Sequence, residues 1–152
     1  MARYLMNDAE IDVPDAAVDE TTHALDLELD GAHAELVVTR ERLDVAHDDP
    51  VAAVRDHDIA AIAGARAEID AAMRAEFAIL GAREGEAGGA PVAEICSRFR
   101  SGDGVVYQRR AHVRAGGASL MFALRGPLAA RAACDAVLDR VLESIRFRHD
   151  EA

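Results

Sequence analysis

Residues 92–127 read VAEICSRFRSGDGVVYQRRAHVRAGGASLMFALRGP, and this stretch predicts three consecutive strands. The runs from Val92 to Arg100 and from Val105 to Val113 flank Ser-Gly-Asp-Gly at residues 101–104, which is a turn composition. Gly116-Gly117 then turns the chain into residues 119–124, an apolar run typical of a strand buried on both faces. Connections this short join antiparallel neighbours. We therefore expect the strands at residues 92–100 and 105–113 to be antiparallel neighbours, together with a preceding strand at residues 77–80.

Further strands precede this stretch. Residues 77–80 indicate a strand, and the glycine- and proline-containing segment 88–91 turns it into the strand that begins at Val92. Residues 23–29 alternate strictly between leucine and other residues, and Asp30-Gly31 turns the chain back into a partner strand at residues 36–40. Near the start of the chain, residues 4–6 and 10–13 predict a small hairpin.

Two helices complete the predicted set. Asp48-Asp49-Pro50 provides an N-cap residue, an acid near the positive helix end and a proline at the first helical position, so a helix is expected from there to about Arg74. A last helix is expected before Arg146, with an exposed face that includes Asp135 and Asp139. Its apolar stripe comprises Ala130, Cys134, Val137, Leu138, Val141, Leu142 and Ile145.

The predicted fold is α+β, with one mostly antiparallel sheet and two helices. The chain has 152 residues, which suits one domain, and it contains neither an internal repeat nor a long linker. We therefore predict a single domain over residues 1–152, of which residues 146–152 form an extended tail.

The charge distribution excludes several functions. The net charge is −11, and all 17 basic residues are arginines, so mechanisms that need a lysine are excluded. A chain this acidic repels phosphate, so no nucleic-acid partner is expected. The first 76 residues hold 19 of the 28 acids, whereas 11 of the arginines lie in the second half. We expect the two halves to face each other within the fold or across a dimer.

Nothing in the sequence predicts catalysis, a cofactor or a metal site. No nucleophile elbow, zinc motif, phosphate loop or dinucleotide fingerprint is present. The six histidines are scattered, and His23 and His33 could approach each other across a hairpin only as a weak metal pair. Cys96 and Cys134 lie in apolar stretches, so we expect reduced core residues and hold a cross-link as the alternative. We therefore predict no enzyme activity.

Localisation is expected to be cytoplasmic. The first eight residues, MARYLMND, lack the basic and then apolar segments of a secretory signal. No run approaches the roughly 20 apolar residues of a membrane span, so direct membrane insertion is not expected.

Five arginines on two adjacent predicted strands leave three interpretations open. Arg98, Arg100, Arg109, Arg110 and Arg114 form this set. They can cover a solvated sheet face, pair with the acidic half of the chain or of a dimer partner, or bind an anionic ligand.

Several blocks of the chain, in order, resemble the DcrB-like family of Eag chaperones. They are RYLMN at residues 3–7, LVVTRE at 36–41, FRSGDG at 99–104, VYQR at 106–109 and SIRFR at 144–148. The resemblance implies a single DcrB-like domain with a fold similar to the Mog and PsbP proteins. It also implies a cytoplasmic homodimer that acts as an adaptor in bacterial type VI secretion.

The same resemblance implies the partners. Such chaperones hold the N-terminal transmembrane helices of secreted PAAR effectors and help to load the effector on the VgrG spike. Leu25, Leu27, Leu36 and Val38 are the expected wall of the groove, although period-2 alternation equally fits ordinary core. Thr39 or Gln108 could hydrogen-bond the client helix.

A rival interpretation comes from another class of protein. The concave sheet could instead serve a small-ligand-binding domain or an enzyme, with His112 or Arg109 at its floor.

Overall fold

A computed structural model describes residues 2–5, 10–13, 22–42, 59–115 and 118–147. The order of its strands and helices follows the predicted order, and the predicted α+β class is confirmed. The elements are β1 (Ala2–Leu5), β2 (Glu10–Val13), β3 (Thr22–Leu29), β4 (Ala32–Arg42), α2 (Ile59–Met73), β5 (Ala78–Ala87), β6 (Ala90–Ser101), β7 (Gly104–Ala115), β8 (Ala118–Pro127), the short 3₁₀ helix η1 (Leu128–Ala130) and α3 (Arg131–Glu143).

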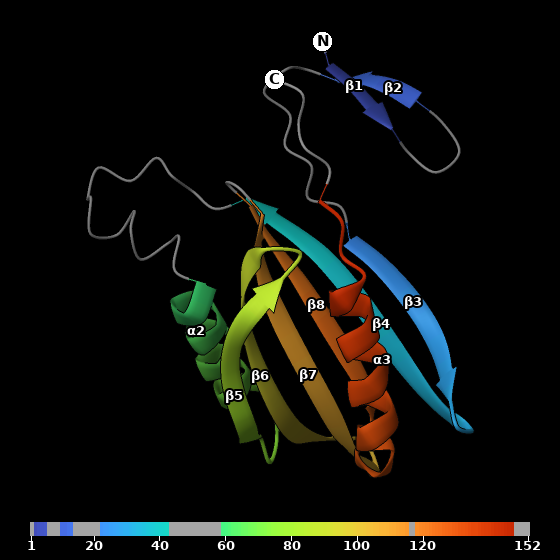
Figure 1. Cartoon of the computed structure of the whole chain (residues 1–152). Helices are drawn as coiled ribbons and strands as arrows, with labels where there is room; N and C mark the ends of the chain where they lie inside the picture. The colour runs from blue at the N-terminus through green and yellow to red at the C-terminus, as the bar shows by residue number, and fades with distance from the viewer. Residues whose placement is uncertain (1, 6–9, 14–21, 43–58, 116–117, 148–152) are drawn as a thin grey trace.

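Six strands form one sheet in the order β3-β4-β8-β7-β6-β5 (Figure 1). Every pair of neighbours in this sheet is antiparallel. β1 and β2 pair with each other as a separate antiparallel sheet, which confirms the predicted N-terminal hairpin. β3 and β5 are the two edge strands of the large sheet, and α3 runs over the face between them (Figure 1).

The turn between β3 and β4 fixes the register of this edge hairpin. Asp30 and Gly31 have φ values of 50° and 83°, and a tight hairpin turn needs this left-handed conformation at both central residues. The turn places Leu25 opposite Leu36 and Leu27 opposite Ala34. Directly opposed residues share a face of the sheet, so the leucines of β3 lie on the same side as Leu36.

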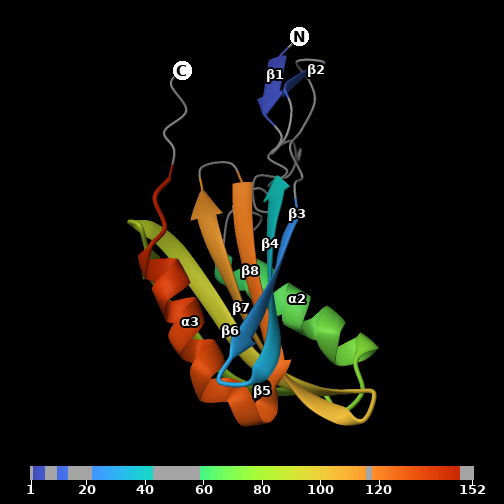
Figure 2. The ribbon, with the colours of Figure 1, turned by 90° about the vertical axis from the view of Figure 1, so that its right-hand side faces the viewer.

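The two helices cover opposite faces of the sheet (Figure 2). α3 packs on β8 through a cluster that includes Leu124 and Leu138, both fully buried. α2 packs mainly on β6 and β7, where Ile59 and Ala63 contact Ala93. Because side chains alternate along a strand, successive side chains of β7 point alternately to the α3 side and the α2 side of the sheet. The sheet is therefore the central layer of the domain.

Some predicted boundaries differ from the observed ones. The predicted helix start at residues 48–50 lies outside the described residues, and the described helix runs from Ile59 to Met73. β5 continues to Ala87, well beyond the predicted end at Leu80, with a register shift between Ile79 and Gly81. Of the predicted tail, residues 146–147 are described, and Phe147 packs against the core under α3.

Gly126 provides a sharp test of the packing between β8 and α3. A Cβ atom at this position would lie 2.9 Å from Cys134 Sγ and 3.4 Å from Ala34 Cβ. Since Cys134 is fully buried, Gly126→Ala is expected to lower the free energy of unfolding by about 1–3 kcal/mol in urea denaturation. Gly85→Ala is the matched control, because no atom lies within 4 Å of its added Cβ. Equal effects of the two substitutions would contradict the close approach.

Candidate functional site

Four of the six residues predicted to form a groove lie on the α3 side of the sheet. Leu25 and Leu27 of β3 share this face with Leu36 and Val38 of β4. Leu36 is only 4% exposed and belongs to the core, so it is not available as a groove surface.

The remaining two predicted groove residues lie on the opposite face. Thr39 is opposite Met121, and Met121 is opposite His112, which places Thr39 on the α2 side. Gln108 is 2% exposed, and its amide contacts Asp70 of α2 at 3.5 Å. The six residues predicted for one groove therefore do not share a face of the sheet. Thr39 follows Val38 along β4 and Gln108 precedes Arg109 along β7, and successive side chains of a strand point to opposite faces.

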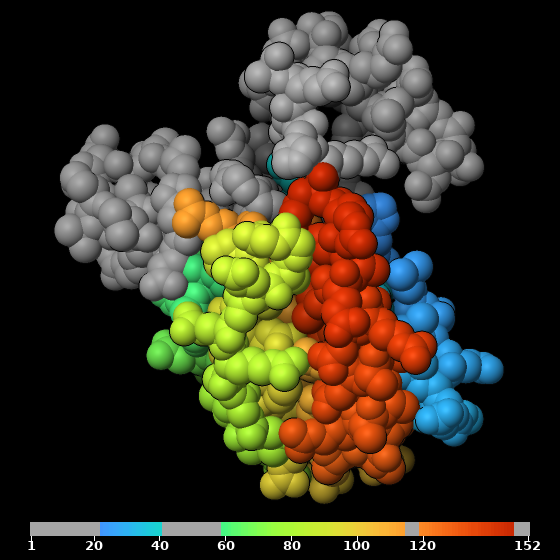
Figure 3. Space-filling model, viewed as in Figure 1, coloured from blue at the N-terminus to red at the C-terminus, as the bar shows by residue number. Residues whose placement is uncertain are grey.

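An apolar row nevertheless remains accessible at the edge of the sheet. We call Leu25, Leu27, Leu29 and Val38 the apolar wall. Leu27, Leu29 and Val38 are partly buried against the core under α3, whereas Leu25 is 52% exposed. Figure 3 shows β3 in blue beside α3 in red, and the strand register places the wall on the side of the sheet that α3 covers. β3 has no hydrogen-bonded neighbour on its outer side among the described strands.

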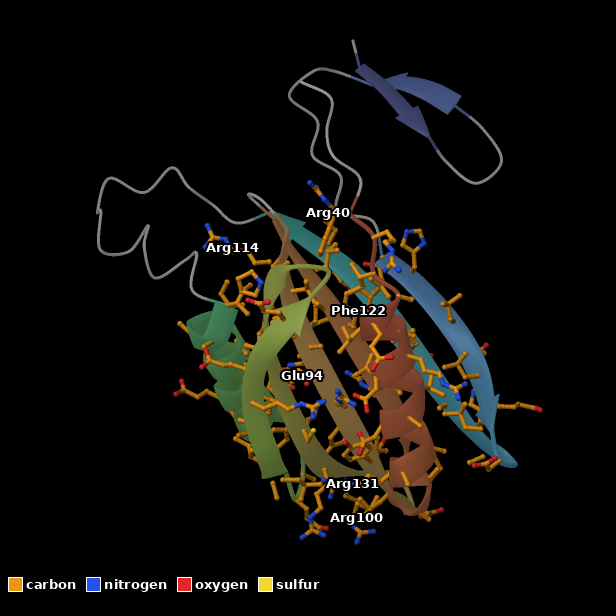
Figure 4. The ribbon with its side chains drawn as sticks, viewed as in Figure 1. Arg40, Glu94, Arg100, Arg114, Phe122 and Arg131 are labelled. Carbon is orange, nitrogen blue, oxygen red and sulfur yellow. The ribbon has the colours of Figure 1, made fainter. Side chains whose placement is uncertain are left out.

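A charged cleft runs between β5 and α3 on the same side of the sheet. Two cavities of about 390 and 250 Å³ share the lining residues Arg83, Glu94, Arg109 and Asp139. Figure 4 shows Glu94 in the space between β5 and α3.

Arg109 is the centre of an ion network in this cleft. Its guanidinium is 2% exposed and donates through Nε and Nη2 to Glu94 Oε1, at 3.1 and 2.7 Å. Nη2 also lies 2.7 Å from Asp139 Oδ1, and Nη1 donates to the backbone oxygen of Asp135 at 3.2 Å. Arg83 pairs with the other oxygen of Glu94. The four polar contacts of Arg109 compensate the cost of burying its charge.

The charges in this cleft compensate one another. Arg109 and Arg83 hold the pKa of Asp139 below its ordinary value. Tyr107 donates to Asp135 at 2.5 Å, and burial together with this carboxylate raises the pKa of the phenol. Asp139 is exposed, as predicted for the outer face of α3, and Asp135 is half-buried, but both carboxylates also reach Arg109. Because these charged side chains pair with one another, a structural role accounts for them without a bound ligand.

A second polar cluster lies on the α2 side. Arg110 pairs with Asp70 of α2 at 2.7 Å, and Arg125 donates through Nε to Gln108 Oε1 at 2.7 Å. His112 is 1% exposed, and neither ring nitrogen has a hydrogen-bond partner among the described residues. Burial, with Arg110 and Arg66 nearby, lowers the pKa of His112 to about 4. The imidazole is therefore neutral at physiological pH.

The rival interpretation placed His112 or Arg109 at the floor of one concavity. These two residues lie on opposite faces, since Arg109 contacts α3 and His112 lies on the α2 side with Arg110. Both are almost fully buried. They cannot belong to a single site.

Three of the five arginines on β6 and β7 form ion pairs within the described part of the chain. Arg110 pairs with Asp70 and Arg100 with Glu76, so two ion pairs join the acidic first half to the second half. Arg109 instead finds its partners within the second half. The sequence did not predict the partners of Arg109, because Glu94 and Asp139 are far apart along the chain.

The histidine and cysteine positions add no metal centre among the described residues. His33 is opposite Glu28 and His23 is opposite Val38, so the weak histidine pair does not form. No group of three potential metal ligands occurs in the described part of the chain. Cys134 is buried, Cys96 is half-buried, and both are free thiols.

No helix within the described ranges has the length and apolar composition needed to span a membrane.

Comparison with solved structures supports the fold. A protein of unknown function from Pseudomonas aeruginosa, described as a candidate regulator, matches with a TM-score of 0.74 and 15% identity, over 98% of both chains. The solution structure of cyanobacterial PsbP from Synechocystis matches with a TM-score of 0.56 and 15% identity, over 97% of this chain and 92% of that one. The predicted PsbP-like architecture is thereby confirmed. No family model and no curated protein sequence matches the chain.

Proposed function

We propose that this chain is a cytoplasmic chaperone of the Eag type that shields apolar helices of a type VI secretion effector. Its client is the N-terminal transmembrane region of a PAAR effector, which the chaperone, as a homodimer, keeps competent for loading on the VgrG spike. The proposal rests on the sequence blocks that resemble the DcrB-like family. The PsbP-like fold is consistent with it.

The observation that carries the proposal is the apolar wall, with Leu25 half-exposed at an edge strand. Leu25 is 52% exposed although it continues a row whose other members pack against the core. A single exposed leucine is ordinary on a protein surface. A leucine that extends a partly buried apolar row offers a larger surface, on which a second apolar element can pack.

The dimensions of the wall suit a helix. Alternate residues of a strand are about 6.6 Å apart, so Leu25, Leu27 and Leu29 span roughly 13 Å. A helix rises about 5.4 Å per turn, so this row contacts two to three turns of a client. Each large apolar side chain that leaves water contributes about 1.5–3 kcal/mol. A few such contacts are enough to compete with aggregation of an exposed membrane helix.

The charge of the chain suits the same role. A complex with an apolar helix must remain soluble in water, and a net charge of −11 opposes aggregation of such complexes. The apolar wall itself contains no charged side chain.

Leu25→Asp is the direct test of this function. The substitution places a charge on the accessible end of the wall, so co-purification with the N-terminal apolar region of a PAAR effector is expected to fall at least tenfold. The recovered client is measured after co-expression, with an affinity tag on the chaperone. Leu25 is exposed enough that the fold should tolerate the change, and circular dichroism checks this.

Ala24→Asp is the matched control for that experiment. Ala24 is also exposed, is adjacent in sequence, and points to the opposite face of β3. Client recovery should stay at the unmodified level. If both variants recover the client equally well, the apolar wall is not the binding surface.

A further inference from the structure

A cavity of about 410 Å³ lies on the α2 side, at the end of the sheet that carries the β6–β7 hairpin. Arg74, at the end of α2, and Arg125 of β8 line it together with Glu35. Its apolar walls are formed by Phe99, Val106 and Pro127. Figure 4 shows Arg100 at the same end of the sheet, next to the hairpin. The cavity is separate from the apolar wall, which lies on the α3 side.

Both arginines lie against the same aromatic ring. The guanidinium carbon of Arg74 is 4.3 Å from the ring centroid of Phe99, and that of Arg125 is 6.0 Å away. Phe99 is itself only 3% exposed, so the ring is a fixed platform. Stacking on an aromatic ring orients guanidinium groups and leaves their outer N–H groups available to a ligand.

Arg125 lacks a carboxylate partner among the residues that the structure describes. Its one described hydrogen bond goes to the neutral Gln108, at 2.7 Å. The nearby Asp70 is already shared, because it lies 2.7 Å from Arg110 and 3.6 Å from Arg74. A half-buried arginine without an acid is unusual, since burial of a charge favours pairing.

The local charge balance is positive in an otherwise acidic protein. Arg74, Arg110 and Arg125 carry three positive charges, whereas Asp70 and the exposed Glu35 carry two negative ones. Burial and the neighbouring arginines lower the pKa of Arg125, and the two carboxylates oppose this effect less strongly. One further negative charge would balance the cluster. In the cleft beside α3, by contrast, Arg83 and Arg109 are already paired with Glu94 and Asp139.

We propose that this cavity binds the carboxylate of a small apolar molecule. Arg125 and Arg74 face the carboxylate, and their forked N–H groups match its two oxygens. Phe99, Val106 and Pro127 pack on the apolar body. A bare inorganic oxyanion would use the arginines but not these walls, so an organic carboxylate is the better match. Glu35 at the rim disfavours ligands of higher negative charge.

The test is a titration of the ¹⁵N-labelled full chain, followed through the amide signals of Gly104, Val105 and Val106. Benzoate is the probe, benzamide is its neutral counterpart of the same shape, and inorganic phosphate is the oxyanion without an apolar body. Benzoate is expected to shift these signals saturably, at least tenfold more tightly than benzamide or phosphate.

Substitutions assign that binding to the cavity. Arg125→Gln and, separately, Arg74→Gln should each weaken benzoate binding at least tenfold. Arg98→Gln removes an equal charge from an exposed position on the opposite face and should leave binding unchanged. The two independent variants guard against a folding defect in either one. Absence of saturable benzoate shifts, equal binding of benzamide or phosphate, or unchanged binding by both cavity variants would overturn the proposal.

Discussion

Replacing Arg109 with methionine is expected to lower the free energy of unfolding by about 3 kcal/mol or more. The Arg109 side chain is 2% exposed, and its removal leaves Glu94, whose side chain is 7% exposed, without the two N–H donors that reach its Oε1. Breaking a buried ion pair by deleting one partner typically costs about 3–5 kcal/mol, because the other charge stays buried. Urea denaturation at neutral pH measures the loss.

Arg83→Met is the matched control for this prediction. Arg83 contacts the same Glu94 and Asp139, but its side chain is 61% exposed. Exposed pairs contribute roughly 0–1 kcal/mol, so this variant should be only slightly destabilised. Equal losses for the two variants would show that burial of Arg109 is not what makes the network important.

The second large effect is a dependence of stability on pH through His112. The folded pKa of His112 is about 4, against 6.5 for an unperturbed histidine. Between these values the unfolded chain binds a proton that the folded chain does not, so stability falls as the pH falls from about 6.5 towards 4. Between pH 7.5 and pH 4.5, protonation of His112 in the unfolded chain lowers the free energy of unfolding by about 2–3 kcal/mol.

His112→Leu should remove this contribution. Leucine has no group to protonate, and it replaces ring nitrogens for which the described part of the chain provides no hydrogen-bond partner. The free energy of unfolding is measured at pH 7.5 and 4.5 for both proteins, and the difference between them isolates His112 from all other titrating groups. The decline should be about 2–3 kcal/mol smaller in the variant. Parallel declines would contradict a neutral buried imidazole.

The hairpins of the large sheet were predictable from local sequence. Asp30-Gly31 and the glycine-rich turn at residues 101–104 define where the chain reverses, and leucine alternation defines the buried face of β3. These signals depend on residues close together in the chain. The succession of strands along the chain and the α+β class followed from them.

The partners of the buried charges could not be predicted in this way. Arg109 meets Glu94 from a neighbouring strand and Asp139 from a helix 30 residues further along the chain. Helical spacing placed Asp139 on an outer face, and only the packing of α3 across the sheet brings it back to Arg109. The placement of Thr39 and Leu36 on opposite faces of the sheet was, in contrast, predictable from the sequence. Both lie on β4, and their positions differ by an odd number, so their side chains point to opposite sides.

Site-specific photo-crosslinking from position 25 tests the central claim most directly. A photoreactive phenylalanine derivative is placed at residue 25 or, as the control, at residue 24, and each chaperone is irradiated in complex with the N-terminal apolar region of a PAAR effector. The apolar wall predicts a crosslink to the client helix from position 25 and at most a trace from position 24. A client that co-purifies but crosslinks equally from both positions, or from neither, would contradict the claim.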